Sequence, residues 1–407
     1  MATVVLIGTM DTKGEEYAWI ADRVRAHGAS TVTIDVGLFS ESAADVTASQ
    51  VAQAGHADLT ALREARDRGA AMEAMASGAT SVTLALHAEG RLDGVLAVGG
   101  SGGSSVASRA MRALPVGVPK LLVSTMASGD VSPYVGESDV TLMHSVVDVA
   151  GINSVSEQVF ANAAAAIAAM AAEQEARRTA PAGEQRPLVG LTMFGLTTPA
   201  VDEARAELVG LGYEPLVFHA TGAGGRAMEK LVRDGRLVGV LDLTTTELAD
   251  DLVGGVLSAG PHRLEAAGEQ GIPQVVSLGA LDLVNFGPRE TVPGAFADRT
   301  FVIHNPTVTL MRTTPEENAE LGRRIGTKLS RARGPVTVLL PLRGVSGIDK
   351  EGGPFRDAAA DGELFSALRG ALTGSPAEIV EVDSHINDRG FGRDAARRLH
   401  GLITSFR

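Results

Sequence analysis

The sequence predicts two α/β domains, each built around a doubly wound, mainly parallel, Rossmann-like sheet. Short continuous apolar runs recur along the chain, which is typical of parallel strands that are buried on both faces. Glycine is frequent, with 48 copies, while aromatic residues make up only 4%, a balance that suits many strand-to-helix turns. At 407 residues the chain also exceeds the usual size of a single core.

Four apolar runs in the first half are predicted to be strands, with helical segments as crossovers between them. These runs are TVVLIG (3–8), TVTIDV (31–36), GVLAVGG (94–100) and KLLVST (120–125). The first half is therefore expected to be a βαβ array that forms one domain over residues 1–174.

A polar stretch with two prolines and a glycine, EQEARRTAPAGEQRP, follows this array. It predicts a linker over residues 175–187, because few packed contacts cross such a segment. The apolar pattern then restarts in a second α/β domain over 188–407. A helix is expected at PAVDEARAELVGLG (199–212). Strands are expected within 187–195, 214–222, 236–247, 272–282, 299–306, 334–342 and 377–388.

Composition excludes several classes of function. The formal net charge of −13 and the scarce aromatic residues argue against a broad nucleic-acid surface. Cysteine is absent, which rules out disulfides, thiolate catalysis and cysteine-ligated metals. The longest apolar run, NAAAAIAAMAA (162–172), is shorter than the roughly 20 residues that cross a bilayer. We therefore expect a soluble, cytoplasmic protein with no membrane partner.

The loop after the first predicted strand has the residues of a phosphate grip. Ligands of open parallel sheets bind beyond the carboxyl ends of the strands. In GTMDTKGEE (8–16) the backbone can turn at Thr9, Asp11 and Thr12 offer side-chain oxygens, and Lys13 offers a mobile positive charge. The alternative interpretation is structural, since Asp and Thr are common helix N-caps.

A glycine-rich loop, GGSGGSS, follows the third predicted strand. Glycine allows close approach of the backbone, so its N–H groups could surround phosphate oxygens. The loop is neither a Walker A motif nor a dinucleotide fingerprint, because its spacing differs from both. A tight turn with close helix packing is the alternative interpretation. The candidate residues are Gly99, Gly100, Ser101, Gly102, Gly103, Ser104 and Ser105.

Small polar residues also follow the second and fourth strands. Asp35 stands where nucleotide-binding folds often place a ribose acceptor. The loop STMASGDVSPYVG (124–136) supplies an aspartate that could orient a metal or a ribose hydroxyl. Three such loops at one sheet edge favour a nucleotide ligand. The candidates in the last loop are Ser124, Thr125, Ser128, Gly129 and Asp130.

Taken in order, these loops and several later motifs closely resemble the ATP-binding family named after a plant tobamovirus-resistance protein. The further motifs include SVVDVAGINSVS (145–156), VFHATGAGGRAMEKL (217–231), LDLTTTELADDLVGG (241–255) and HNPTVTLMRTT (304–314). The resemblance covers nearly the whole chain. It implies ATP bound by the amino-terminal domain through the three loops above, and assembly as a homodimer or higher oligomer. We expect Mg²⁺ to accompany the ATP, because phosphoryl transfer needs charge neutralisation.

Polar residues at strand ends of the second half suggest a site for a small anionic metabolite. An anion could rest on a helix N-terminus beside Arg226. The candidate catalytic residues are Arg226, Glu229, His304, Arg312 and His385. His219 and Asp242 could instead bind a metal, although no spacing typical of a metal motif supports this.

Three functions remain open from the sequence. The first is an ATP-dependent enzyme that acts on a small anionic metabolite in the carboxy-terminal domain, since phosphoryl transfer needs mainly positioning and charge neutralisation. The second is a non-catalytic ATP-dependent sensor or interaction module. The third is a metal-dependent lyase or hydrolase centred on the carboxy-terminal domain.

Overall fold

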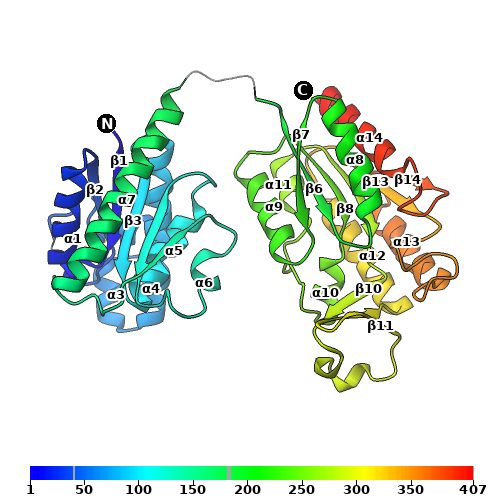
Figure 1. The fold of residues 1–407 in the computed structure, drawn as a ribbon, viewed down its shortest axis with the longest axis horizontal. Coiled ribbons are helices and arrows are strands. Elements are labelled where there is room, and N and C mark those ends of the chain that lie inside the picture. The colour runs from blue at the N-terminus through cyan, green and yellow to red at the C-terminus, as the bar shows by residue number, and fades with distance from the viewer. Residues whose placement is uncertain (40–41, 181–184, 407) are drawn as a thin grey trace. The chain divides into compact units, whose positions relative to one another are not determined.

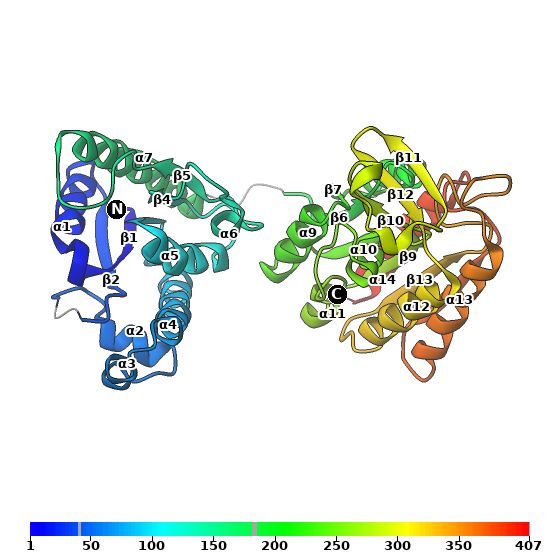
Figure 2. The same ribbon diagram turned by 90° about the horizontal axis from the view of Figure 1, so that it is seen from below.

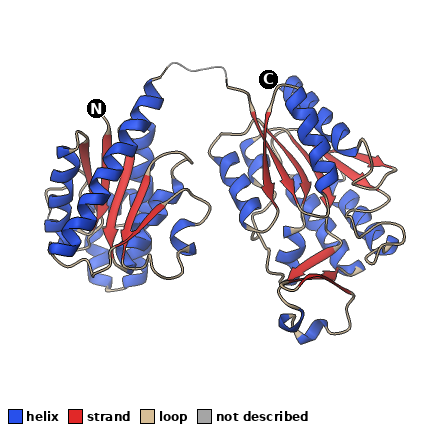
Figure 3. Ribbon diagram, in the orientation of Figure 1, coloured by secondary structure: helices blue, strands red, loops and turns tan. Residues whose placement is uncertain are grey.

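The computed structural model describes residues 1–39, 42–180 and 185–406. The chain divides into two compact units, Met1–Gly183 and Glu184–Arg407. Each unit is an α/β domain with a mainly parallel sheet and helices on both faces (Figure 1), as the secondary-structure colouring of Figure 3 also shows. The predicted fold class is confirmed.

The sheet of the amino-terminal unit has five parallel strands in the order β2-β1-β3-β4-β5. The strands are β1 (Thr3–Gly8), β2 (Ser30–Asp35), β3 (Gly94–Gly99), β4 (Lys120–Ser124) and β5 (Thr141–His144). The first four match the predicted runs to within one residue at each end. The short edge strand β5 has no buried residue, so its sequence lacks the apolar run that marked the others.

Helices cover both faces of this sheet (Figure 2). They are α1 (Met10–Ala26), α2 (Ala48–Ala54), α3 (Leu59–Ala65), α4 (Arg68–Ala88), α5 (Ser101–Ala113), α6 (Ser132–Val135) and α7 (Ser154–Thr179). Val4 and Leu6 of β1 pack with α1 and α7, while Val5 and Ile7 pack with α2, α4 and α5. Alternate strand residues thus face opposite layers.

Helix α7 differs from the sequence prediction at its end, because residues 175–179 of the predicted linker are helical. Its last turns carry charges on the solvent side, which made the segment look like a linker. Arg177 pairs with Glu173 one turn earlier, and Arg178 reaches the buried carboxylate of Asp93 at 3.0 Å. Ion pairs along one helix face support such a helix end.

Within the described part of the chain, one helix is long and apolar enough to cross a membrane by length and composition, and that helix is α7. Its Phe160, Ala164 and Ile167 are fully buried against the sheet. Core helices of globular domains pack in the same way, so the structure looks like that of a soluble globular protein.

The carboxy-terminal unit has a six-stranded parallel sheet in the order β14-β13-β9-β8-β6-β7. The strands are β6 (Leu188–Met193), β7 (Glu214–His219), β8 (Gly239–Thr244), β9 (Gln274–Gly279), β13 (Val336–Pro341) and β14 (Glu378–Val382). The helices are α8 (Thr198–Gly210), α9 (Ala223–Arg233), α10 (Glu247–Val253), α11 (Ala266–Gln270), α12 (Pro315–Leu329), α13 (Ala358–Leu372) and α14 (Phe391–Phe406). In both units the first strand lies between the second and the third.

A small antiparallel sheet in the carboxy-terminal unit was not predicted. It consists of β10 (Leu283–Phe286), β11 (Phe301–Asn305) and β12 (Val308–Arg312), with the short 3-10 helices η1 (Arg289–Thr291) and η2 (Gly294–Phe296) before β11. Residues 299–306 therefore contain an antiparallel strand and not a parallel one. The turn at Asn305 explains this, because its side chain accepts a hydrogen bond from Thr307 N at 2.9 Å and closes a hairpin.

Candidate functional site

A cavity of about 850 Å³ lies beyond the carboxyl ends of the strands in the amino-terminal unit. Strand order reverses between β1 and β3, and the loops after both strands line the cavity. Open parallel sheets bind their ligands at such a switch point. Among the predicted nucleotide-site residues, the lining includes Thr9, Asp11, Thr12, Lys13, Gly100, Ser101, Gly102 and Gly103.

The start of α5 presents backbone N–H groups to this cavity. Gly100 is the N-cap and makes no side-chain capping bond. Ser104 N bonds to Gly100 O at 2.9 Å, but within the described residues the three preceding N–H groups, at 101–103, have no acceptor. An ideal Cβ on Gly103 would meet nothing within 4 Å. The helix N-terminus is therefore open to the cavity and carries partial positive charge.

Lys13 lines the cavity from an irregular first turn of α1. Its φ of −137° is not helical, so α1 has a kink at this residue. The side chain donates a hydrogen bond to the carbonyl oxygen of Val149, in the loop after β5. Thr9 and Thr12 share a hydrogen bond of 2.9 Å between their hydroxyls. These residues are together, as the sequence predicted, but each already has a partner within the protein.

Asp35, the predicted ribose acceptor, does not line the cavity. It is 1% exposed. One carboxylate oxygen accepts from Met10 N at 3.1 Å and from Gly37 N at 2.8 Å, and the other accepts from the Ser42 hydroxyl. The strand-end position is as expected, but the carboxylate is used to hold the loops after β1 and β2.

Asp11 lines the cavity and also holds the loop after β2. Its Oδ2 accepts from Phe39 N at 3.1 Å. An ideal Cβ on Gly37 would lie 2.5 Å from Asp11 Oδ1, so only glycine allows this close packing. Asp11 is thus a cavity residue with a structural bond.

Three arginines of the cavity were missed by the sequence analysis. Arg63 lies in the last turn of α3, Arg66 follows that helix, and Arg68 is the first residue of α4. An ideal Cβ on Gly102 would lie 3.5 Å from Arg68 Nη2, which brings this guanidinium near the start of α5. In the part of the chain that the structure describes, neither Arg66 nor Arg68 has a carboxylate within ion-pair distance. No strand precedes these arginines, so the strand-end rule could not select them.

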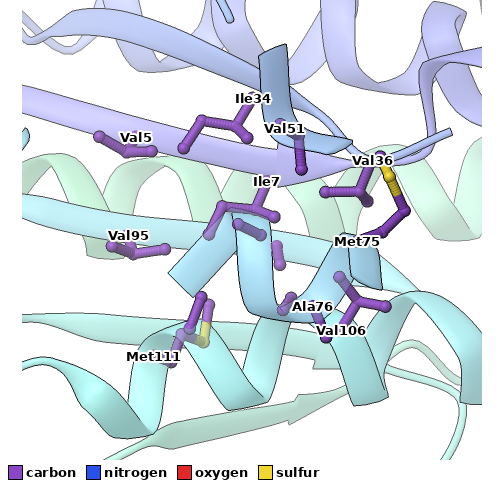
Figure 4. Packing of buried hydrophobic residues seen from close by; sticks show 14 of the residues in the cluster. Val5, Ile7, Ile34, Val36, Val51, Met75, Ala76, Val95, Val106 and Met111 are labelled. Atoms are coloured by element: carbon purple, nitrogen blue, oxygen red, sulfur yellow. The ribbon is translucent and has the colours of Figure 1, made fainter. Parts of the chain in front are cut away.

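Apolar side chains form most of the remaining wall of the cavity, which Asp67 and Asp148 also line. Val36, Met75 and Val106 belong to the buried core of the unit, and Figure 4 shows them beside one another within that core. Leu38, Leu62 and Met72 are partly buried and pack against it. The cavity therefore joins a basic, amide-lined part to an apolar part.

The predicted loop after β4 does not line the cavity. Ser124 is buried, and its hydroxyl lies 2.7 Å from that of Ser104. Asp130 Oδ1 accepts from Ser132 N and Oγ, and these hydrogen bonds lower the pKa of Asp130. Thr125 is close, since a Cβ on Gly100 would lie 3.8 Å from its hydroxyl. The remaining predicted residues outside the lining are Gly99, Ser105, Ser128 and Gly129.

Several predicted residues of the carboxy-terminal unit are engaged in intramolecular bonds. Glu229 accepts from Leu264 N and Ala266 N, both at 2.8 Å. Arg312 donates to Phe355 O at 2.7 Å and to Asp361 at 2.9 Å. His385 Nε2 lies 2.7 Å from the carbonyl oxygen of Ser346. These three side chains support the fold, because their polar atoms are paired within it.

The weak metal candidates are not arranged as ligands. Both oxygens of Asp242 accept from Arg263, at 2.5 and 2.7 Å, inside a fully buried ion-pair network that includes Glu247. His219 is exposed at the end of β7. Across residues 1–39, 42–180 and 185–406 no group of three or more His, Asp or Glu side chains is placed to hold a metal ion. The two remaining predicted catalytic residues, Arg226 on α9 and His304 on β11, are exposed.

A buried carboxylate cluster lies beside Arg312 and was also missed. Burial, reinforced by the charge of Asp349, raises the pKa of both Asp282 and Asp361 to about 7. Ser346 Oγ donates to Asp282 Oδ2 at 2.8 Å. Asp282 follows β9 and Asp349 follows β13, whereas Asp361 lies in the first turn of α13. Only the tertiary fold therefore brings these three acids together.

Two family models match this chain. Residues 2–176 match the amino-terminal domain of the uncharacterised protein family UPF0261, and residues 186–403 match its carboxy-terminal domain. A UPF0261 protein of Clostridium tetani is 50% identical over 98% of both chains. One from Rhizobium meliloti is 47% identical over 97% of this chain and 98% of its own length.

A plant protein is also similar. The ToMV resistance protein Tm-1(GCR237) of Solanum lycopersicum is 41% identical over 99% of this chain, which spans 55% of the tomato protein. Among solved structures, a UDP-GlcNAc 2-epimerase from Neisseria meningitidis bound to UDP-GlcNAc aligns over all of both chains. The identity is 11% and the TM-score 0.23, values too low to bear on function.

Proposed function

Because this chain belongs to the uncharacterised protein family UPF0261 over both of its units, we propose a function from the geometry of its amino-terminal cavity. The cavity binds a nucleoside triphosphate, and ATP with Mg²⁺ is the ligand that we propose. The protein acts in the cytoplasm as a homodimer or higher oligomer.

The basic part of the cavity would hold the phosphates. Free N–H groups at a helix N-terminus bind phosphate oxygens well, because donors and the helix dipole act together. Arg68 lies near the start of α5, and Lys13 and Arg66 line the same cavity. Guanidinium and ammonium groups would neutralise a triphosphate. Asp11, Asp67 and Asp148 also line the cavity, but within the described residues none of them is within ion-pair distance of Arg66 or Arg68.

One observation carries the proposal. A basic, amide-lined part and an apolar part belong to the same cavity of about 850 Å³, at the switch point of the sheet. A phosphate or carboxylate alone would use the basic part and leave the apolar wall without a ligand. A nucleotide has a charged tail and a flat, weakly polar base, so it suits both parts. Mg²⁺ in such sites is held mainly by the phosphates and one or two carboxylates.

Calorimetric titration of the full chain with ATP, with and without Mg²⁺, tests the proposal. We expect Arg68→Ala to weaken ATP binding by about tenfold or more, the loss expected for a charge-assisted hydrogen bond. Arg91→Ala is the matched control, since Arg91 precedes β3 at the opposite end of the sheet and forms an exposed pair with Glu89. Absence of ATP binding in the parent protein would overturn the proposal.

The intramolecular bonds of Glu229, Arg312 and His385 favour a second candidate, an ATP-dependent sensor or interaction module. An ATP-dependent enzyme acting on a small anionic metabolite would need such side chains free to meet the substrate. ATP hydrolysis measured with a panel of carboxylic and phosphorylated acids separates the two. Turnover that depends on one acid would support the enzyme, and no turnover across the panel would support the sensor.

A further inference from the structure

We infer that the cavity holds the base of its nucleotide by packing alone, so that purine and pyrimidine nucleoside triphosphates bind with similar affinity. This inference rests on the proposed function and adds the class of nucleotide that the site accepts. It is carried by the chemistry of the apolar wall and by the hydrogen bonds of the loop that forms it.

The side chains of the wall offer no groups that could read a base edge. Val36, Met75 and Val106 are 5%, 2% and 6% exposed and belong to the domain core. Leu38, Leu62 and Met72 extend this surface into the cavity. Core residues cannot be turned away from the cavity without loss of packing, so the wall stays apolar when a ligand enters.

The backbone of the loop after β2 is also engaged. Val36 N bonds to Gly8 O at 2.9 Å, and Gly37 N bonds to Asp35 at 2.8 Å. Phe39 N bonds to Asp11 at 3.1 Å. These N–H groups would otherwise be natural partners for ring nitrogens and carbonyl oxygens of a base.

One carbonyl and the acid of this loop are occupied in the same way. Arg63 Nε donates to the carbonyl oxygen of Leu38. Asp35, which stands where a ribose acceptor is expected, accepts three hydrogen bonds from the protein and does not line the cavity. These polar groups of the loop are therefore used to build it. Asp67, which also lines the cavity, accepts a hydrogen bond from Ala70 N at 3.0 Å, so this carboxylate too has a partner within the protein.

The energetic consequence is weak discrimination between bases. A site that hydrogen-bonds a polar group rejects an analogue without that group by orders of magnitude, whereas an apolar pocket distinguishes similar shapes poorly. Met72 and Met75 strengthen this expectation, since the flexible thioether side chain adapts to different ring sizes. We expect selection by the triphosphate and not by the base.

Calorimetric titration of the full chain with ATP, GTP, CTP, UTP and inorganic tripolyphosphate, each with Mg²⁺, tests the inference. The four nucleotides should have dissociation constants within about tenfold of one another, and tripolyphosphate should bind more weakly because it lacks the packed base. A preference of about a hundredfold or more for one base would overturn the inference while the proposed function stands. Failure of all four nucleotides to bind would overturn both.

A variant of the wall makes the test sharper. Met72→Ala should weaken all four nucleotides by a similar factor and weaken tripolyphosphate less, since the base packs on the wall, although Met72 Cε also lies near the start of α5, 3.8 Å from an ideal Cβ on Gly102. Met126→Ala is the matched control, because Met126 is 38% exposed and does not line the cavity. Loss confined to a single nucleotide would show a specific base contact and contradict the inference.

Discussion

The hydroxyl of Tyr17 accepts a hydrogen bond from the backbone N–H of Val98 at 2.8 Å. It also donates to the carbonyl oxygen of Ile7 at 2.6 Å. The pairing of β1 with β3 ends at Ile7 and Ala97, so this buried hydroxyl bridges the two strands where they separate below the cavity. An ideal Cβ on Gly8 would lie 2.0 Å from the Tyr17 ring, which explains why that strand ends in glycine.

Tyr17→Phe should destabilise the amino-terminal unit by about 1–3 kcal/mol, because a buried N–H and a buried carbonyl lose their partner. Urea denaturation followed by circular dichroism measures the change. Tyr134→Phe is the control, since in the described part of the chain the hydroxyl of Tyr134 on α6 makes no hydrogen bond. Equal losses in the two variants would show that the bridge adds nothing.

Lys13→Met should weaken ATP binding by about tenfold or more, because a charged donor to phosphate is removed. Folding should persist, since Glu16 on the same helix still accepts from Gly151 N at 2.6 Å and holds the loop after β5. Arg25→Met, which removes an exposed charge from α1, is the control for charge. Calorimetry reports both affinities, and an unchanged affinity for Lys13→Met would remove this residue from the site.

Arg263→Met should destabilise the carboxy-terminal unit by about 3–5 kcal/mol, because Asp242 and Glu247 would be left as buried charges without their cation. These two carboxylates are 1% and 0% exposed. Arg343→Met removes a similar two-bond pair with Asp383, but both side chains are exposed, at 64% and 73%. Thermal unfolding should show a large shift for the first variant and little change for the second.

Asp282→Asn should change how stability depends on pH. Burial and the neighbouring charge of Asp349 raise the pKa of Asp282 to about 7 in the folded protein, whereas an unfolded aspartate titrates near ~4. Between these two values the folded state binds the extra proton, so this group lowers stability as pH rises towards 7. The asparagine of the variant does not titrate, so the variant does not lose stability in this way as the pH rises.

Unfolding of parent and variant at pH 5 and pH 8 measures this effect. Relative to the parent, the free energy of unfolding of Asp282→Asn should be higher at pH 8 than at pH 5 by roughly 1–3 kcal/mol, since one pKa unit corresponds to about 1.4 kcal/mol. Asp202→Asn, at an exposed position of α8, should show no such growth. The same difference at both pH values would contradict the role assigned to Asp282.

The loops after β1 and β3 could be predicted from the sequence, because a buried parallel strand followed by small and polar residues has a local signature. The same rule was insufficient for Asp35. Its place at a strand end is a local property, but the partners of its carboxylate, Met10 N and Gly37 N, are set by how two loops meet. The loop after β4 shows the same limit, since Ser124 turned to Ser104 and not to the cavity.

The sequence by itself determined two parallel α/β sheets, the glycine-rich start of α5 and the chain position of Lys13, since periodicity and backbone freedom act over a few neighbouring residues. Only the tertiary structure decided that Arg66 and Arg68 complete the cavity, that Asp242 is neutralised by Arg263, and that residues 283–312 form an antiparallel sheet. The first two depend on contacts between segments far apart in the chain, where burial and pairing of charge select the partner. The sheet depends on the pairing of β10 with β12 across the segment between them, in addition to the local turn at Asn305.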